Sequence, residues 1–167
     1  SPCYRPYIWK FSIYTTVATK GKNMIYGVSI VSDEARIVLV NGDKNNFQAE
    51  SCKTKLALPK GDDSVKAILE FQKNFVMLLQ NDKPEFVVIS EGGHDSKKKR
   101  VRMEFAILCA CFQNSIRCET YASSAVSKLI KSGFSKTTGL DFTTEYEKTG
   151  LLQKDKNSFT VAWRHLG

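Results

Sequence analysis

The order in which strand-like and helix-like apolar patterns follow one another restricts the fold of this chain most strongly. From Met24, two runs rich in Ile and Val, residues 25–31 and 35–40, are separated by the polar turn 32–34. β-Branched residues favour strands, and a short turn between two such runs predicts a hairpin. We expect a third strand within residues 46–57.

Helical and strand patterns then alternate. Apolar side chains recur at helical spacing between Val65 and Leu79, which predicts an amphipathic helix. Residues 86–89 form a wholly apolar run that suits a central strand covered on both faces. A second helix is expected over 101–114, after a basic run, and a further strand over 116–120.

The last part of the chain is predicted to be mainly helical. We expect a helix over 123–130 that Gly133 ends, because glycine is the common residue just past a helix. Residues 134–144 are rich in Gly, Thr and Ser and predict a surface loop. A final helix is expected over 145–166, broken near Gly150.

The order of these elements defines the fold class. Three strands come first, and helix, strand, helix, strand, helix, loop and helix follow. A hairpin-led meander followed by alternating helices and strands predicts an α/β protein with a mixed sheet and helices packed on it. At 167 residues the chain has the length of one compact domain, which we place at 24–167.

Residues 1–23 differ from the rest of the chain. They carry four basic residues and no acid, and Lys10 interrupts their apolar stretch, so neither a signal peptide nor a membrane anchor is expected. We hypothesise that the natural chain starts at Met24 and that 1–23 is a tag or a translated upstream extension. The alternative is an added edge strand, because large apolar residues between Trp9 and Val17 fall at even spacing.

Charge and cysteine content are weak guides to function in this chain. The formal net charge is +8, but residues 24–167 hold 21 bases against 17 acids, so half of the excess lies in 1–23. A basic protein favours nucleic acid or another anionic partner without choosing among them. Five cysteines without a C-x-x-C pair indicate neither a disulfide framework nor a zinc site, and they fit a reducing cytoplasm.

Three passages of the chain resemble a known superfamily in their order and spacing. They are Met24-Ile-Tyr-Gly-Val-Ser-Ile, then Phe86-Val-Val-Ile-Ser-Glu91 with a basic helix start and Met103-Glu104 behind it, and Cys118-Glu-Thr-Tyr-Ala. The chain resembles the RuvC-like branch of the ribonuclease H-like superfamily, the relatives of Holliday-junction resolvases, and more closely a small uncharacterised bacterial family within it. The resemblance covers most of residues 24–130 and implies a ribonuclease H-like mixed sheet.

The resemblance also implies where a metal site belongs. Active nucleases of the superfamily hold two Mg²⁺ or Mn²⁺ ions with carboxylates from the first strand, the end of the central strand and the last helix, because two hard cations must clamp one phosphate. In this sequence the first-strand position is Ser29, which supplies no anionic ligand. Asp33 and Glu34 lie in the next turn, too far along the hairpin to replace it.

The other two positions supply part of the expected set. Glu91 directly follows the central strand, and the two glycines after it permit close approach by a ligand; the alternative is a solvated loop acid. On the last helix the position falls near Asn157, with Asp155 two residues away on another helical face. The predicted metal ligands are therefore Glu91 and Asp155, and Mg²⁺ or Mn²⁺ is the cofactor expected of an active nuclease.

Glu104 is a candidate catalytic acid beside Glu91. It is the only charged residue in the apolar stretch 103–112. Because a buried charge without a partner is costly, Arg100 or Arg102 is the expected partner in a structural ion pair, which is the alternative to a functional acid.

Five basic residues within six positions lie beside this candidate site. They are Lys97, Lys98, Lys99, Arg100 and Arg102. As phosphate contacts they would hold a nucleic-acid backbone with an affinity that falls as salt rises. The alternative is the solvated start of a helix.

These features favour a protein that binds branched or structured DNA or RNA and whose metal-nuclease site is degenerate. An active Mg²⁺- or Mn²⁺-dependent nuclease with an unusual carboxylate set is one alternative. A protein-interaction or regulatory module on the same fold, working as a homodimer or with another partner, is a second. A nucleotide-binding function is disfavoured, because the sequence lacks a Gly-rich phosphate loop with a following Lys-Ser/Thr.

Overall fold

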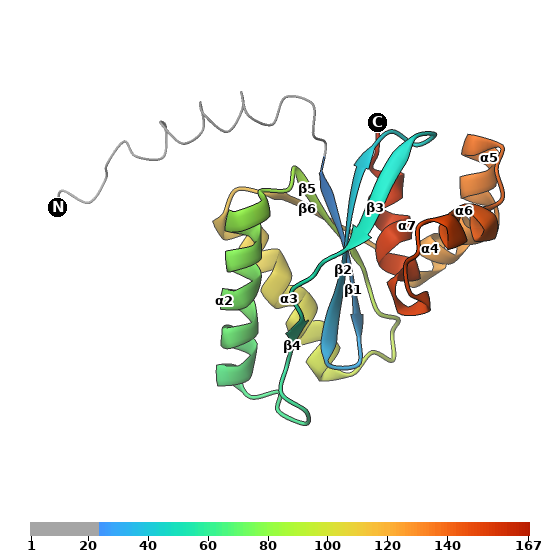
Figure 1. Ribbon diagram of the computed structural model, residues 1–167. Coiled ribbons are helices and arrows are strands. Elements are labelled where there is room, and N and C mark those ends of the chain that lie inside the picture. The colour runs from blue at the N-terminus through green and yellow to red at the C-terminus, as the bar shows by residue number, and fades with distance from the viewer. Residues whose placement is uncertain (1–23) are drawn as a thin grey trace.

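One sheet forms the centre of the molecule (Figure 1). The structure is a computed structural model that describes residues 24–167, so the hypotheses on residues 1–23 concern a segment outside the described residues. The strands are β1 (Ile25–Val31), β2 (Glu34–Gly42), β3 (Phe47–Ser51), β4 (Leu56–Ala57), β5 (Phe86–Ser90) and β6 (Arg117–Tyr121).

The sheet is mixed, as the element order predicts. Its strand order is β3-β2-β1-β5-β6, and β4 pairs with β2 beside this path. β2 runs antiparallel to β1 and β3, whereas β5 runs parallel to β1 and β6. The predicted hairpin and central strand are confirmed. The predicted third strand over 46–57 is split into β3 and the two-residue β4, both of which pair with β2.

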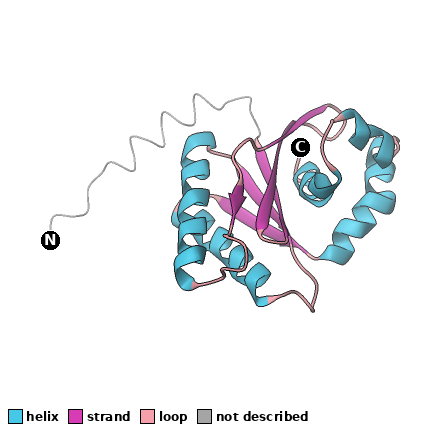
Figure 2. Ribbon diagram, turned by 60° about the horizontal axis from the view of Figure 1, so that its bottom comes forward, coloured by secondary structure: helices cyan, strands magenta, loops and turns pink. Residues whose placement is uncertain are grey.

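Helices cover both faces of the sheet (Figure 2). On one face lie α2 (Val65–Asp82) and α3 (Lys98–Gln113). On the other face lie α4 (Ser123–Lys128), the π-helix η1 (Leu129–Gly133), α5 (Phe134–Thr138), α6 (Phe142–Lys148), the 3₁₀ helix η2 (Gln153–Asp155) and α7 (Lys156–Arg164). None of the helices in the described part of the chain is long and apolar enough to cross a membrane.

The alternation of side chains along β1 decides which residues face α7. Tyr26, Val28 and Ile30 pack into the core under α2 and α3, and Ile25 packs into the core under α7. Because successive side chains of a strand point to opposite faces, Ser29 lies on the α7 face.

The start of α7 lies very close to β1, on the face of the sheet that carries Ser29. A Cβ atom at Gly27 would overlap the backbone carbonyl of Ser158, so glycine is needed for α7 to lie this close to β1. The residues that precede and begin α7 are therefore held beside the carboxyl-terminal half of β1.

The structure differs from the sequence-based predictions in two regions. The basic run does not precede the second helix but begins it, since α3 starts at Lys98. The predicted loop over 134–144 is wrong: helix continues through Gly133 into α5, and α6 begins within the same span. Phe134 and Phe142 are buried there in the aromatic core around Trp163, and this packing outweighs the loop-like composition. The predicted break at Gly150 is confirmed.

Candidate functional site

Three buried serines lie where α7 meets the central strands. Ser29 on β1 pairs in register with Ser90 at the end of β5, and Ser158 belongs to the first turn of α7. Their exposed fractions are 2%, 1% and 0%. Ser29 and Ser90 share the α7 face, because Val28 and Ile89 beside them point into the opposite core. Beside the position predicted near Asn157, Ser158 faces the sheet, whereas Asn157 is exposed.

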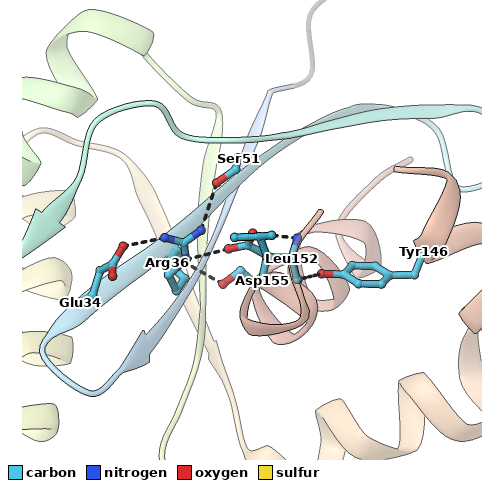
Figure 3. Close-up of polar contacts among 7 residues, drawn as sticks. Glu34, Arg36, Ser51, Tyr146, Leu152 and Asp155 are labelled. Atoms are coloured by element: carbon cyan, nitrogen blue, oxygen red, sulfur yellow. Dashed lines mark hydrogen bonds and ion pairs between the residues drawn. The ribbon is translucent and has the colours of Figure 1, made fainter. Parts of the chain in front are cut away.

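Arg36 on β2 is the charged centre of this region. It lies directly opposite Ser29 in the antiparallel pair, so both side chains are on the same face of the sheet. Its Nε donates to Asp155 Oδ1 at 2.8 Å, and its Nη1 donates to Glu34 Oε1 at 2.6 Å (Figure 3). Ser158 Oγ donates to the Arg36 carbonyl at 2.8 Å, which fixes α7 to β2.

Asp155 is fully buried and is held from both sides. Its Oδ1 accepts from Arg36, and its Oδ2 accepts the backbone N–H of Leu152 at 3.3 Å. Tyr146 donates its hydroxyl hydrogen to the Leu152 carbonyl, which ties α6 to the same turn (Figure 3). Burial, and then the nearby negative charge of Asp155, raise the pKa of Tyr146 to about 12, so this hydroxyl stays a donor at neutral pH.

Arg36 keeps its charge in this setting. Its hydrogen bond to Asp155 is the largest cause that raises its pKa above the usual value, and the bond to Glu34 adds to it against the opposing effect of burial. The Arg36 side chain is 14% exposed and the Asp155 side chain 0%, so solvent screens this ion pair weakly.

Glu91 follows β5 and lies apart from this network. Its backbone N–H donates to the Tyr121 carbonyl at 2.8 Å, which extends the pairing of β5 with β6 by one residue. Within residues 24–167 its carboxylate makes no hydrogen bond or ion pair, to Asp155 or to any other residue. The predicted role of Glu91 as a metal ligand or catalytic acid stays a prediction.

Glu104 holds the loop that follows β5. Its Oε1 accepts from Arg100 Nε at 2.8 Å and from the backbone N–H of Gly92 at 3.0 Å. Arg100 in turn donates through Nη2 to the Ser90 carbonyl at 3.2 Å. The structural ion pair given as the alternative for Glu104 is therefore present, with Arg100 as the partner.

The basic residues at the start of α3 fall into two groups. Three of them pair with carboxylates: Lys99 with Asp33, Arg100 with Glu104, and Arg102 with Asp63. Lys97 and Lys98 are exposed and have no partner in the described part of the chain.

A crevice of about 460 Å³ opens beside this basic helix start. The turn between β1 and β2 forms one wall, and the loop before α3 forms the other. Its lining includes Ser32, Gly93, Ser96, Lys97, Lys99 and Arg100. A Cβ atom at Gly92 behind it would lie 2.0 Å from Ser96 Oγ and 2.6 Å from Arg100 Nε, so a side chain there would force these two side chains to move.

The residues present do not fit a pair of divalent metal ions. The strand and helix positions that meet under α7 are occupied by neutral serines, and the one buried carboxylate of the described chain, Asp155, is bonded to Arg36. Within residues 24–167 no group of three or more His, Cys, Asp or Glu side chains is placed to hold a metal ion. Hard divalent cations need several oxygen ligands with negative charge, and this arrangement supplies them to a guanidinium instead.

Solved structures with the same fold define the class. Thermus thermophilus RuvC is similar with a TM-score of 0.63 and 14% identity, over 85% of this chain and 92% of that one. The same protein in complex with Holliday junction substrate is similar at 0.63 and 12% identity, over the same shares of the two chains. The yeast mitochondrial Holliday junction resolvase Ydc2 is similar at 0.50 and 9% identity, over 83% of this chain and 77% of that one. The fold is therefore ribonuclease H-like, of the RuvC-like type, as the resemblance implies.

The family follows from a match along the described chain. Residues 24–165 match the family described as "Protein of unknown function (DUF3010)", and the chain belongs to this family. No curated protein matches the sequence.

The sequence does not predict Arg36 or Ser158 as parts of the site. Arg36 carries a detectable signal, because it is a single charged residue between Ala35 and the apolar run from Ile37. Such a residue in an otherwise buried strand needs a partner. Its partner lies 119 residues away, and no local pattern identifies it.

Proposed function

We propose that this protein binds structured or branched DNA or RNA through the basic start of α3, and that it does so without metal-dependent hydrolysis. The observation that carries the proposal is the set of side chains found around the start of α7. Ser29 stands where the resemblance implies the first-strand carboxylate, and Asp155 is bonded to Arg36, while basic side chains line the neighbouring crevice.

The charges beside the crevice support a phosphate-binding role. Lys97 and Lys98 are free to contact phosphates, and Lys99 and Arg100 line the same crevice from within ion pairs. The similar RuvC structure with a Holliday junction substrate supports nucleic acid as the partner class. The cysteines of the described chain are unpaired, and on that ground we place the protein in a reducing cytoplasm.

Fluorescence anisotropy tests this proposal. Labelled four-way junctions, duplexes and single strands of DNA and RNA are titrated with the full chain in EDTA over a series of salt concentrations. We expect binding without metal and an affinity that falls as salt rises. Replacement of Lys97 and Lys98 by Gln should weaken binding and reduce the slope of log K against log salt by about two, because each lysine neutralises one phosphate.

The matched control replaces two exposed lysines of α2, Lys66 and Lys73, by Gln. It changes the net charge by the same amount away from the crevice, and it should leave the affinity within about twofold of the unmodified chain. The absence of salt-sensitive binding to every probe would overturn the proposal. Mn²⁺-dependent cleavage that disappears in Glu91→Gln would establish the alternative, an active nuclease.

A groove between α2 and α3 favours a second role for this protein, self-association. It encloses about 550 Å³ between α2 and α3, and Val65, Leu69 and Phe105 along it are exposed by 76%, 57% and 63%. Asp63 and Arg102 at its margin are half-exposed and pair with each other, and in a symmetric dimer each would also meet the opposite charge of the second copy. Sedimentation velocity should show a dimer that Phe105→Glu dissociates; a monomer at every concentration would exclude this role.

A further inference from the structure

We propose that the guanidinium of Arg36 is a built-in cation shared by Asp155 and Glu34, and that its removal turns these oxygen donors into a divalent-metal site. In the native chain the two carboxylates are then saturated and do not take a metal ion. The inference depends on the donor geometry alone and does not require that the protein bind nucleic acid.

Three oxygen donors from separate elements converge on this one side chain. Asp155 Oδ1 lies 2.8 Å from Nε, Glu34 Oε1 lies 2.6 Å from Nη1, and Ser51 Oγ lies 3.4 Å from Nη2 (Figure 3). They come from η2, β2 and β3, which the fold holds around the guanidinium. Two carboxylates and a hydroxyl are hard oxygen ligands of the kind that Mn²⁺ and Mg²⁺ take.

The surroundings fix these donors in position. Asp155 is held by the Leu152 N–H, and the hydroxyl of Tyr146 holds Leu152 in turn. Ser158 ties α7 to the backbone of Arg36 itself, so this contact does not depend on the Arg36 side chain. Truncation of the guanidinium therefore removes the cation and leaves the framework that orients the carboxylates.

An ion would have both a need and a path to this place. Buried Asp155 without Arg36 is an uncompensated charge, which is costly and which another cation would relieve. A small cavity of about 180 Å³, lined by Glu34, Arg36 and Ser51, adjoins the guanidinium between β2 and the segment that follows β3. Lys53 and Lys55 line it as well and Asp155 does not, so the cavity reaches the guanidinium from its Glu34 and Ser51 side.

Mn²⁺ binding to the full-length chain tests the proposal. The free Mn²⁺ signal in electron paramagnetic resonance and the thermal unfolding midpoint are measured for the unmodified chain, Arg36→Ala and Arg36→Ala/Asp155→Asn. We expect Arg36→Ala to bind Mn²⁺ at least tenfold more tightly than the other two and to unfold at a higher temperature when Mn²⁺ is present. Arg100→Ala is the matched control: it frees Glu104 from an arginine without exposing a second carboxylate, and should gain no Mn²⁺ affinity.

Each result decides the matter. An Arg36→Ala chain that is unfolded alone and folds when Mn²⁺ is added supports the proposal, and so does an Arg36→Lys chain that folds without gaining Mn²⁺ affinity. Mn²⁺ binding by the unmodified chain that Asp155→Asn abolishes would overturn it. An Arg36→Ala chain that stays unfolded in millimolar Mn²⁺, or folds and binds no more Mn²⁺ than the unmodified chain, would overturn it as well.

Discussion

Two arginine–carboxylate pairs of this protein have the same distance between the arginine Nε and a carboxylate oxygen and differ in their surroundings. In each, the arginine Nε lies 2.8 Å from a carboxylate oxygen: Arg36 from Asp155, and Arg100 from Glu104. Asp155 is fully buried and bonds to β2 from the start of α7, whereas Arg100 is 28% exposed and both members of its pair belong to α3. The two pairs therefore have the same N–O distance and different roles. The Arg36–Asp155 pair joins distant parts of the fold, and the Arg100–Glu104 pair holds the loop after β5, which borders the crevice.

The largest effect is expected at the buried pair. Asp155→Ala leaves the partly buried guanidinium without its main partner and should lower the free energy of unfolding by about 3–5 kcal/mol, measured by urea denaturation. The double variant Arg36→Met/Asp155→Leu removes both charges and should recover most of this loss, since the desolvation of both groups is avoided. A loss below about 1 kcal/mol in Asp155→Ala would show that the pair does not hold the fold.

A smaller loss is expected at the pair on α3. Glu104→Ala removes charge-assisted bonds to Arg100 and to the Gly92 N–H and should cost about 2 kcal/mol of unfolding free energy. Amide hydrogen exchange at Gly92 should become faster, because this N–H loses its acceptor. Unchanged exchange at Gly92 would mean that Glu104 does not hold the loop.

His165 extends the comparison to a partly buried ionisable group whose charged form is only weakly stabilised. Burial lowers its pKa below the usual 6.5, and Glu119, which is 53% exposed, opposes this only in part. Below about pH 6.5 the unfolded chain then binds more protons than the folded one, so stability falls as the pH decreases. The unmodified chain should therefore lose stability between neutral pH and pH 5 more steeply than His165→Gln; identical pH profiles would contradict this.

The smallest effect is expected where both partners are in solvent. Arg102 and Asp63 are 52% and 50% exposed and 3.3 Å apart, so water and salt screen their attraction. Arg102→Gln should change the free energy of unfolding by less than about 1 kcal/mol in urea denaturation. A loss as large as that of Glu104→Ala would show that exposure does not separate these pairs.

The sequence predicts the parts of the fold in which periodicity and packing agree. β1 and β5 are mainly apolar because they are covered on both faces, β2 carries the apolar run from Ile37 to Val40, and α2 repeats its apolar residues at helical spacing. The prediction of a loop over 134–144 is wrong because the composition of this segment is loop-like. Its structure depends on two aromatic residues, Phe134 and Phe142, that pack against α7. Contacts of that kind leave no local pattern.

In the site, too, contacts between residues near in sequence are predictable and contacts between distant residues are not. The partnership of Arg100 and Glu104 is predictable, since residues four apart on a helix face each other. The partnership of Arg36 and Asp155 is not, because the chain between them must fold before they meet. The role expected for Asp155 as a metal ligand followed from the family resemblance, and its bond to Arg36 appears only in the three-dimensional structure.

If Arg36 takes the place of a metal ion in this protein, then DNA binding needs no divalent metal and no cleavage follows, and one paired experiment measures both. A labelled four-way junction is titrated with the full chain in EDTA and in Mn²⁺ at the same ionic strength, and the strands are then examined on a denaturing gel. We expect equal affinities in the two conditions and intact strands. Binding that requires Mn²⁺, or cleavage in Mn²⁺ that Asp155→Asn abolishes, would contradict it.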